Sequence, residues 1–479
     1  MVFNSYIFIF LLLPLSLLSY FIFNKFKFYK SAKISLLCFS LWFYGYFNYH
    51  YLFIILLSII FNFYISKFTY SNKKNLILGL VVNLSIIFVF KYYDFFIDNI
   101  NFVFKQDLNY LRLIMPLGIS FFTFQQISYL VDNYKCSTNY SLIDYSLYIS
   151  FFPQLVAGPI VLHNEFIPQL NNINIKKSDC KNLYIGLYKI SIGLFKKVII
   201  ADNIGVIVNV IYNLGYDDLS FFTSLVAILS YTIQIYCDFS GYSDIAIGIG
   251  NLFNFNLPIN FNSPYQSTSI VEFWSRWHIS LSNFLKKYVY IPLGGNSKGT
   301  RRTCINIILV FLLSGFWHGA NWTFILWGLL HGIGNTFNKL THTKFTKVPL
   351  CLKWALTFTF INITFVFFRS PNIETAINIL RGLFNFDFIF SNSFIYKIGY
   401  ELYPIISNLG NIIRLSTGLV VLGFFILLFT IVIASLLLIK NIHVYDIEPT
   451  YLNMATIIFC LTLSIISFSR MSTFLYFNF

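Results

Sequence analysis

The fold class is decided by the stretch from Tyr236 to His331. Residues 236–296 read YCDFSGYSDIAIGIGNLFNFNLPINFNSPYQSTSIVEFWSRWHISLSNFLKKYVYIPLGGN, and after a basic turn residues 312–332 read LLSGFWHGANWTFILWGLLHG. Three of the seven histidines and five of the seven tryptophans fall in this stretch, and Asp238 and Asp244 interrupt an apolar run. Polar chemistry is therefore concentrated here, and we expect the rest of the chain to hold this segment in a membrane.

The composition favours the same class. The chain is 57% hydrophobic and 11% charged, with a mean hydropathy of +0.70, and few soluble proteins could bury so much apolar surface. We expect an all-α polytopic membrane protein with about 10 to 13 membrane helices and re-entrant segments around a central polar tunnel. It is interpreted as one domain, residues 1–479, with N-terminal spans (1–112), a core (113–370) and C-terminal spans (371–479).

The net charge of +15 lies in short loops between apolar runs, which favours contact with the cytoplasmic membrane face over nucleic-acid binding. Lys25, Lys27, Lys30 and Lys33 follow the first apolar run, so the N-terminus is expected outside the cytoplasm. The seven cysteines are scattered singly, and neither a disulfide framework nor a metal site is indicated.

Apolar runs predict the spans, and polar residues inside them raise specific questions. Gln125 and Gln126 are expected to bond to a neighbouring helix, with tunnel lining as the alternative. Prolines 153 and 159 predict a re-entrant segment. Asp238 and Asp244 are expected to cap the helix after a break, or Asp238 positions a histidine or a hydroxyl. The predicted spans are Met1–Phe23, Ile34–Phe47, Tyr51–Ser66, Leu76–Tyr92 (followed by a mixed loop, Lys91–Arg112), Leu113–Val131, Leu219–Cys237, Cys304–Leu313, Trp354–Phe368, Ser416–Ile439 and Tyr451–Phe468.

Two local patterns surround the histidines. Apolar residues recur at helical spacing from Ile270 to Tyr290, which predicts one amphipathic helix along the membrane surface or a polar cavity, with His278 at the border of its faces. Gly315 and Gly319 are four residues apart and mark a packing face. His318 lies between them, and an ionisable side chain at membrane depth is a functional candidate.

Four cations, Lys286, Lys287, Arg301 and Arg302, surround the turn at Pro292–Asn296. Such a cluster either sets the topology as a solvated cytoplasmic loop or meets the phosphates of an acyl donor.

Seven motifs resemble, in order, those of the membrane-bound O-acyltransferases, over about residues 115–370. The branch that they resemble contains the alginate and peptidoglycan O-acetyltransferase membrane subunits, to which the D-alanyl teichoic acid transferase subunit is related. The motifs are FFTFQQISYLVDNYK, FFPQLVAGPIV, YCDFSGYSDIAIGIG, NFNSPYQSTSIVEFWSRWHISLS, YIPLGGN, SGFWHGANWTFILWGLLHG and FVFFRS.

The resemblance implies roles for particular residues. His318 matches the histidine tied to catalysis and is expected to be the general base; neutral imidazole suits that task near pH 7. His278 is expected to bind donor, to orient acceptor or to be structural, and His331 to be structural. The expected tunnel and supporting residues are Asp238, Trp274, Trp277, Trp317, Asn321 and Trp322.

The resemblance also implies the reaction. An acyl group, acetyl in this branch, would pass from a cytoplasmic thioester (acetyl-CoA or an acyl carrier) to an envelope polysaccharide, with no bound cofactor and with a separate extracytoplasmic SGNH-type acyltransferase as partner. The chain would then lie in the bacterial cytoplasmic membrane. D-alanyl transfer to teichoic acid is the alternative within the class, and a transporter or non-catalytic scaffold is the alternative outside it.

Overall fold

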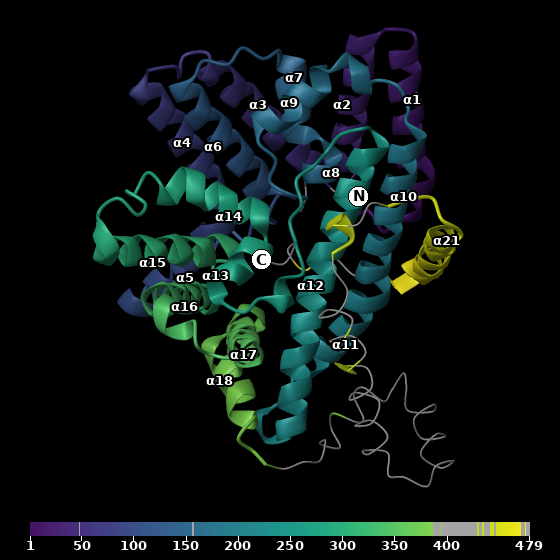
Figure 1. Cartoon of the computed structure of the whole chain (residues 1–479). Helices are drawn as coiled ribbons and strands as arrows, with labels where there is room; N and C mark the ends of the chain where they lie inside the picture. Colours follow the sequence, from purple (N-terminus) through teal and green to yellow (C-terminus); the bar gives the residue numbers. More distant parts are fainter. Residues whose placement is uncertain are drawn as a thin grey trace.

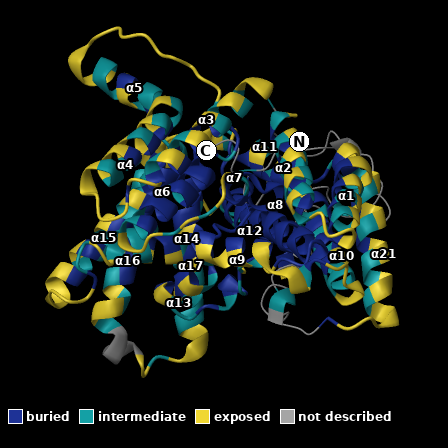
Figure 2. Cartoon of the chain, turned by 90° about the horizontal axis from the view of Figure 1, so that it is seen from above, coloured by how far each residue is buried: buried dark blue, intermediate teal, exposed yellow. Residues whose placement is uncertain are grey.

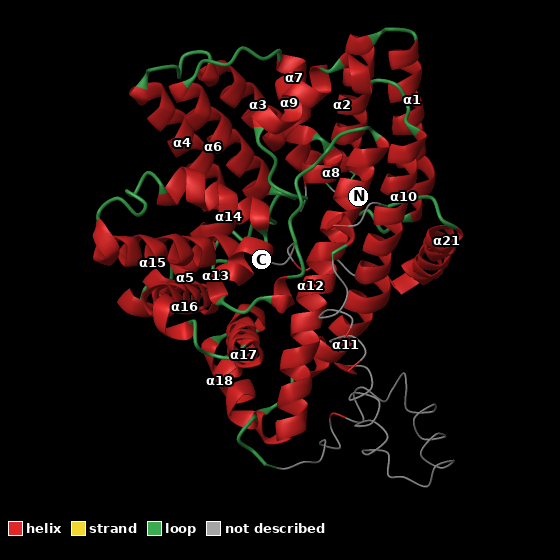
Figure 3. Ribbon diagram, in the orientation of Figure 1, coloured by secondary structure: helices red, strands yellow, loops and turns green. Residues whose placement is uncertain are grey.

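The structure, a computed structural model, describes residues 1–46, 48–155, 158–386, 394, 429–430, 434, 441–444, 447–470 and 475. Within these residues every regular element is a helix (Figure 3), which confirms the all-α class. Most of the predicted span Ser416–Ile439 lies outside the described residues.

The helices follow one another along the chain in three groups. The first group is η1 (Phe8–Leu12), α1 (Leu13–Lys25), α2 (Tyr29–Gly45), α3 (Tyr49–Ser66), α4 (Lys73–Ile87), η2 (Phe88–Tyr92) and α5 (Tyr93–Phe104). The second is α6 (Ile119–Lys135), α7 (Leu142–Ser150), α8 (Phe152–Leu155), α9 (His163–Asn171), η3 (Ile173–Ile175), α10 (Cys180–Leu194), η4 (Phe195–Ala201), α11 (Asp202–Ile211), η5 (Tyr216–Asp218) and α12 (Phe221–Leu252). The third is η6 (Pro264–Gln266), α13 (Ile270–Arg276), α14 (Ile279–Leu285), η7 (Lys286–Tyr290), α15 (Gly299–His318), α16 (Trp322–Phe345), α17 (Leu350–Arg369), α18 (Ile373–Gly382), η8 (Ile442–Val444), α21 (Tyr451–Ile466) and η9 (Ser467–Arg470).

Six helical segments of the described chain are long and apolar enough to cross a membrane. They are Phe8–Lys25, Tyr49–Ser66, Lys73–Phe104, Phe221–Leu252, Gly299–His318 and Leu350–Arg369. Large apolar side chains such as Phe53, Leu57 and Val81 are exposed on α3 and α4, as expected where a helix meets lipid. Two boundaries in this part of the chain were predicted wrongly: the loop expected from Lys91 is helical as far as Phe104, and the span expected from Leu113 begins at Ile119.

Buried amides and hydroxyls join α3, α4 and α6. Gln126 Oε1 accepts hydrogen bonds from Ser58 Oγ at 2.7 Å and from Asn62 Nδ2 at 2.9 Å. Asn62 and Asn83 bond to each other across α3 and α4, and Gln125 Nε2 donates to the Val161 carbonyl. Both glutamines therefore hold neighbouring segments together, as the sequence predicts, because a buried amide away from water must find a protein partner.

Helix α12 stands at the centre of the molecule, with α10 and α11 beside it (Figure 1). In Figure 2 the buried residues gather around α12, α8 and α14. The break predicted near Asp238 is wrong, because α12 continues to Leu252. Its glycines serve packing instead: a Cβ on Gly241 would lie 2.7 Å from the Gly193 carbonyl oxygen on α10, and one on Gly248 equally close to that of Gly186.

The two acids of α12 are paired with cations of the π-helix η4. Asp238 Oδ1 lies 2.6 Å from Lys197 Nζ, and Asp244 Oδ2 lies 2.7 Å from Lys196 Nζ. His443 Nε2 approaches the other oxygen of Asp244 at 2.8 Å. The acids are thus enclosed in the middle of a helix, where pairing offsets their desolvation, and they do not cap a helix end.

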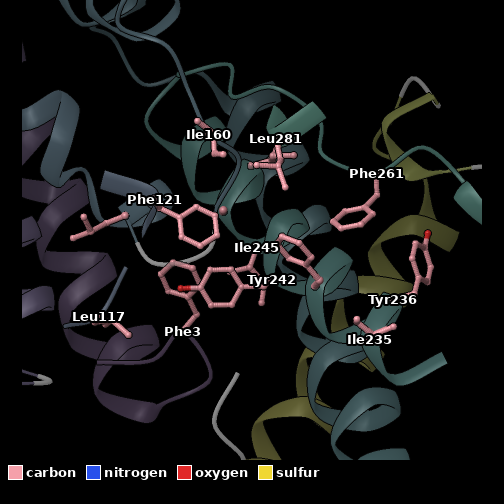
Figure 4. Packing of buried hydrophobic residues seen from close by; sticks show 14 of the residues in the cluster. Phe3, Leu117, Phe121, Ile160, Ile235, Tyr236, Tyr242, Ile245, Phe261 and Leu281 are labelled. Atoms are coloured by element: carbon pink, nitrogen blue, oxygen red, sulfur yellow. The ribbon is translucent and has the colours of Figure 1, made fainter. Parts of the chain in front are cut away.

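Residues 158–162, between α8 and α9, are non-helical and largely enclosed by protein, as the two prolines predict. The Ile160 amide donates to Ser280 Oγ at 3.0 Å, and the Val161 carbonyl accepts from Tyr148 Oη at 3.2 Å. Non-helical backbone is tolerated at membrane depth when its polar groups are satisfied in this way. Ile160 lies near Leu281 and Phe121 in the packed interior, where Phe3 and Tyr242 stack at 4.7 Å (Figure 4).

Candidate active site

His278 lies at a break between α13 and α14, so the single amphipathic helix expected from Ile270 to Tyr290 is wrong. Trp277 is extended and His278 is left-handed, with φ 45° and ψ 53°. The Ile279 amide then donates to the Asn260 carbonyl instead of continuing the helix. His278 is fully buried, and the break has moved it from the expected border of two faces into the interior.

The neighbours of His278 determine which ring nitrogen carries the proton. The Ser280 amide donates to Asn260 Oδ1 at 3.2 Å, which identifies that atom as an oxygen. His278 Nδ1 lies 3.2 Å from the same oxygen, so Nδ1 must be the donor. His278 Nε2 then keeps its lone pair, and within the described residues this buried atom has no hydrogen-bond partner. A nitrogen in this state can accept a proton from a substrate.

His318 is the last residue of α15, in a turn that glycines bring close to α16. A Cβ on Gly315 would lie 2.3 Å from the Phe324 carbonyl oxygen and 3.1 Å from the Cα of Gly328. A Cβ on Gly319 would collide with the Phe324 ring at 2.2 Å. The glycines are thus a helix-packing face, as predicted, and the close crossing buries His318, which is 3% exposed.

The Trp317 indole brings the two candidate histidines together. Its ring centroid lies 6.3 Å from that of His278 and 4.8 Å from that of His318. Phe124 of α6 stacks on the indole at 5.1 Å, and Phe368 of α17 packs on His318 at 5.1 Å. Aromatic side chains of three helices, α6, α15 and α17, therefore form an apolar shell at the two imidazoles.

His331 is fully buried on α16 and belongs to the adjoining aromatic cluster. Its Nδ1 accepts a hydrogen bond from Trp274 Nε1 at 3.1 Å. Trp327 contacts His331 at 4.8 Å and His318 at 5.1 Å, so one indole links the two histidines although they lie on different helices, α16 and α15. The bond to Trp274 supports a structural role for His331.

The remaining expected tunnel residues lie in different surroundings. Trp277 packs in a buried cluster with Phe273, stacked at 5.4 Å, and Phe365. Asn321 caps α16 through the Thr323 amide and donates to the Pro371 carbonyl. Trp322 is 54% exposed and donates to Asn99 Oδ1.

Asp238 and the basic residues were also predicted to take part. Asp238 faces Lys197, and its second oxygen accepts from the Leu475 amide at 3.0 Å. Lys287 Nζ pairs with Asp132 at 2.9 Å, so its charge is already matched, whereas Lys286, Arg301 and Arg302 are exposed.

A cavity of about 1380 Å³ adjoins the aromatic cluster, between α13, α15, α16 and α17. Phe311 and Phe360 line it, and their rings also contact His331, at 6.2 and 5.5 Å. The cavity is thus separated from His331 by single aromatic side chains.

Two residues of the site were missed from the sequence. Asn260 orients His278, but an asparagine in an irregular segment carries no distinguishing signal. Trp327 joins His318 to His331, and its position among other tryptophans of the same stretch was the available signal.

Comparisons with known proteins identify the family. A sequence profile of the membrane-bound O-acyltransferase family matches residues 130–374, and a peptidoglycan O-acetyltransferase of Helicobacter pylori is 41% identical over 100% of this chain and 98% of its own length. The chain belongs to the membrane-bound O-acyltransferase family. It is therefore an acyltransferase and a multi-pass membrane protein.

Other members of the membrane-bound O-acyltransferase family are also similar. A probable alginate O-acetylase of Pseudomonas aeruginosa is 34% identical over 90% of this chain and 81% of its own length. A teichoic acid D-alanyltransferase of Bacillus subtilis is 28% identical over 54% of this chain and 70% of its own length. The residues that the family profile matches, 130–374, contain His278, Trp317 and His318, so the predicted family is confirmed over the segment that carries the site.

Proposed function

We propose that this acyltransferase moves an acetyl group from a cytoplasmic thioester, acetyl-CoA or an acyl carrier, for O-acetylation of an extracytoplasmic polysaccharide. Relatives named for O-acetyl transfer align over 81–100% of this chain, whereas the D-alanyl relatives align over 47–54%. The difference supports acetyl as the acyl group and a bacterial envelope glycan as the final acceptor.

The observation that carries this proposal is the meeting of two buried histidines at Trp317. Acyl transfer needs a base for the hydroxyl proton and exclusion of the water that would hydrolyse the donor. We assign His318 as the general base. His278, with Nε2 as an acceptor, orients the acceptor sugar by accepting from a hydroxyl other than the reacting one, whose proton goes to His318.

The reaction balances with these two side chains and the substrates. The hydroxyl proton passes to the imidazole of His318 as the hydroxyl oxygen bonds to the thioester carbonyl carbon. The C–S bond then breaks, and the leaving sulfur takes the proton from His318. The apolar shell of Trp317, Trp327 and Phe368 keeps water from competing for the carbonyl carbon.

The donor would approach from the side of the exposed cations. Lys286 follows α14, and Arg301 and Arg302 lie in the first turn of α15, where the helix dipole adds positive potential. A CoA or acyl-carrier phosphate suits this arrangement. We place the enzyme in the cytoplasmic membrane with its N-terminus outside, and we propose an extracytoplasmic SGNH-type acyltransferase as partner. The G-x-S-x-G match at residues 295–299 lies in a turn before α15 and not at the strand-to-helix turn that makes such a serine a nucleophile.

The test is the acetate that mild base releases from the cell envelope of a deletion strain. The strain is complemented with wild type, His318→Ala, His278→Ala or the control His50→Ala, which changes an exposed histidine at the start of α3. We expect wild type and His50→Ala to restore acetate and His318→Ala to restore none at equal membrane level. Full acetylation by His318→Ala would refute the base assignment. Release of D-alanine in place of acetate would refute the acyl group.

A further inference from the structure

Lys91 lies beside the site, and the reaction proposed above gives it no role. It lies in the π-helix η2, inside the apolar helical segment Lys73–Phe104. Its Nζ donates to the Trp317 carbonyl at 2.6 Å and to the His318 carbonyl at 3.0 Å. An ionisable residue in such a segment is costly to place there and is by default a functional candidate.

These two carbonyls belong to the end of α15, where helix geometry leaves them without intrahelical partners. The chain turns away at Gly319, which is extended, so the helix cannot continue and satisfy them. Away from water such groups must be satisfied by protein. A cation also matches the negative end of the α15 dipole, so an ammonium group is well suited to this place.

The neighbouring residue extends the same contact. Tyr92 Oη donates to the Phe316 carbonyl at 2.9 Å, and the two rings stack at 4.2 Å. Three consecutive carbonyls, those of residues 316–318, are thus bound by two consecutive side chains. These three residues include Trp317 and His318, the two site residues that α15 contributes.

The helical segment Lys73–Phe104 also contacts Trp322, which follows the turn after His318. Asn99 on α5 accepts a hydrogen bond from Trp322 Nε1 at 3.0 Å, and Phe95 packs on the Trp322 ring at 5.9 Å. Trp322 opens α16. The turn that carries His318 is therefore fixed to α4–η2–α5 before and after it.

We propose that Lys91 is a positioning residue of the acyltransferase, which sets the orientation of the His318 imidazole by binding the carbonyls of Trp317 and His318. This inference rests on the proposed function, in which His318 is the base. Lys91 itself touches no reacting atom in this scheme. It acts by fixing the backbone from which the catalytic side chain extends.

The first test compares Lys91→Met, Lys91→Arg and the control Lys74→Met in the complemented deletion strain, at equal membrane level. Methionine keeps most of the length of the side chain but donates nothing, and Lys74 is an exposed lysine at the start of α4. A misplaced catalytic group can cost about 100-fold in rate, so Lys91→Met should lower acetate incorporation by about 10- to 100-fold. Lys91→Arg should recover most of the rate, and Lys74→Met should match wild type. A wild-type rate in Lys91→Met would overturn the proposal.

A second measurement separates positioning from general damage. In purified protein labelled with [15N]histidine, the His318 signal is assigned by its loss in His318→Ala. We expect it to move in Lys91→Met, to return towards wild type in Lys91→Arg, and to stay in place in Lys74→Met, while the His331 signal stays unchanged in all three. An unmoved His318 signal in Lys91→Met would refute the positioning role.

The two proposals fail in different ways. If His318→Ala retains full acetylation while Lys91→Met still shifts the His318 signal, the base assignment is wrong and the link between Lys91 and His318 stands. If His318→Ala is inactive but Lys91→Met changes neither rate nor signal, the base assignment stands and the inference about Lys91 is wrong.

Discussion

His278 is held in a left-handed backbone conformation that non-glycine residues rarely adopt. Such a conformation costs about 1–3 kcal/mol and persists where surrounding contacts enforce it. Here the Asn260 carbonyl and Asn260 Oδ1 bind the amides of Ile279 and Ser280 and so fix the break. The same asparagine determines the ring tautomer, so backbone strain and imidazole chemistry at this residue have one cause.

A substitution of His278 can separate these two effects. Asparagine tolerates the left-handed conformation and can donate to Asn260, but it lacks the Nε2 lone pair. His278→Asn should therefore keep a near-wild-type Tm and lose envelope acetylation, whereas His278→Ala should also lose about 1 kcal/mol of stability. Thermal unfolding in detergent and released acetate measure the two effects. Normal acetylation in His278→Asn would show that Nε2 has no part in the reaction.

At the scale of elements, α10 and α12 approach so closely that their glycines cannot carry side chains. We expect Gly241→Leu to disrupt this contact and to cost about 1–3 kcal/mol or more, because neither backbone can move away within the packed centre. Gly215→Leu is the matched control, since a Cβ there meets nothing within 4 Å. Membrane level and melting temperature by fluorescence-detected size exclusion measure the effect. Equal stability of the two variants would contradict a tight α10–α12 contact.

The buried ion pairs between η4 and α12 give a second prediction at this scale. Lys197 lies 2.6 Å from Asp238 and 2.7 Å from Asp202, with all three side chains largely enclosed. Lys197→Met leaves buried carboxylates without their cation and should cost about 3–5 kcal/mol. Adding Asp238→Asn should recover part of the loss, because one charge is then removed. Thermal unfolding of the single and double variants decides this, and a double variant less stable than Lys197→Met would argue against charge pairing as the cause.

The start of α15 is the element expected to meet the donor. Neutralising Arg301 and Arg302 to Ala should raise the apparent KM for acetyl-CoA, measured as thiol release by membranes, with little change in membrane level. The charge-matched control is Lys73→Ala with Lys74→Ala, which removes two exposed cations at the start of α4. An unchanged KM in the arginine variant would show that Arg301 and Arg302 do not bind the donor and serve only to set the membrane topology.

At the scale of the whole molecule, the basic loops are expected on one membrane side and the tip between α2 and α3 on the other. All seven cysteines are free, so a cysteine-less variant should keep envelope acetylation and can carry single labels. Cysteine at Asn48 should react with an impermeant maleimide in intact cells, and cysteine at Lys298 only after permeabilisation. The reverse pattern would invert the proposed orientation.

Much of the architecture could be predicted because spans are local patterns. The helices at residues 49–66, 299–318 and 350–369 coincide with apolar runs, since side-chain hydropathy over some 20 residues decides insertion. The glycines of the S-G-F-W-H-G motif were correctly interpreted as a packing face, because a missing side chain permits close approach whatever the partner is.

The sequence by itself determined the membrane class, the acyltransferase family and the segment that contains the histidines, because these depend on composition and on motifs contiguous in the chain. Only the tertiary structure decided the continuity of α12, the break at His278 and the contact of Lys91 with the end of α15. Each of these depends on a partner outside the local segment. The partners are the glycines and lysines of α10 and η4, Asn260, which is 18 residues before His278, and carbonyls more than 200 residues from Lys91. Local pattern cannot encode such a partner, because the same residue caps, breaks or continues a helix according to what packs against it.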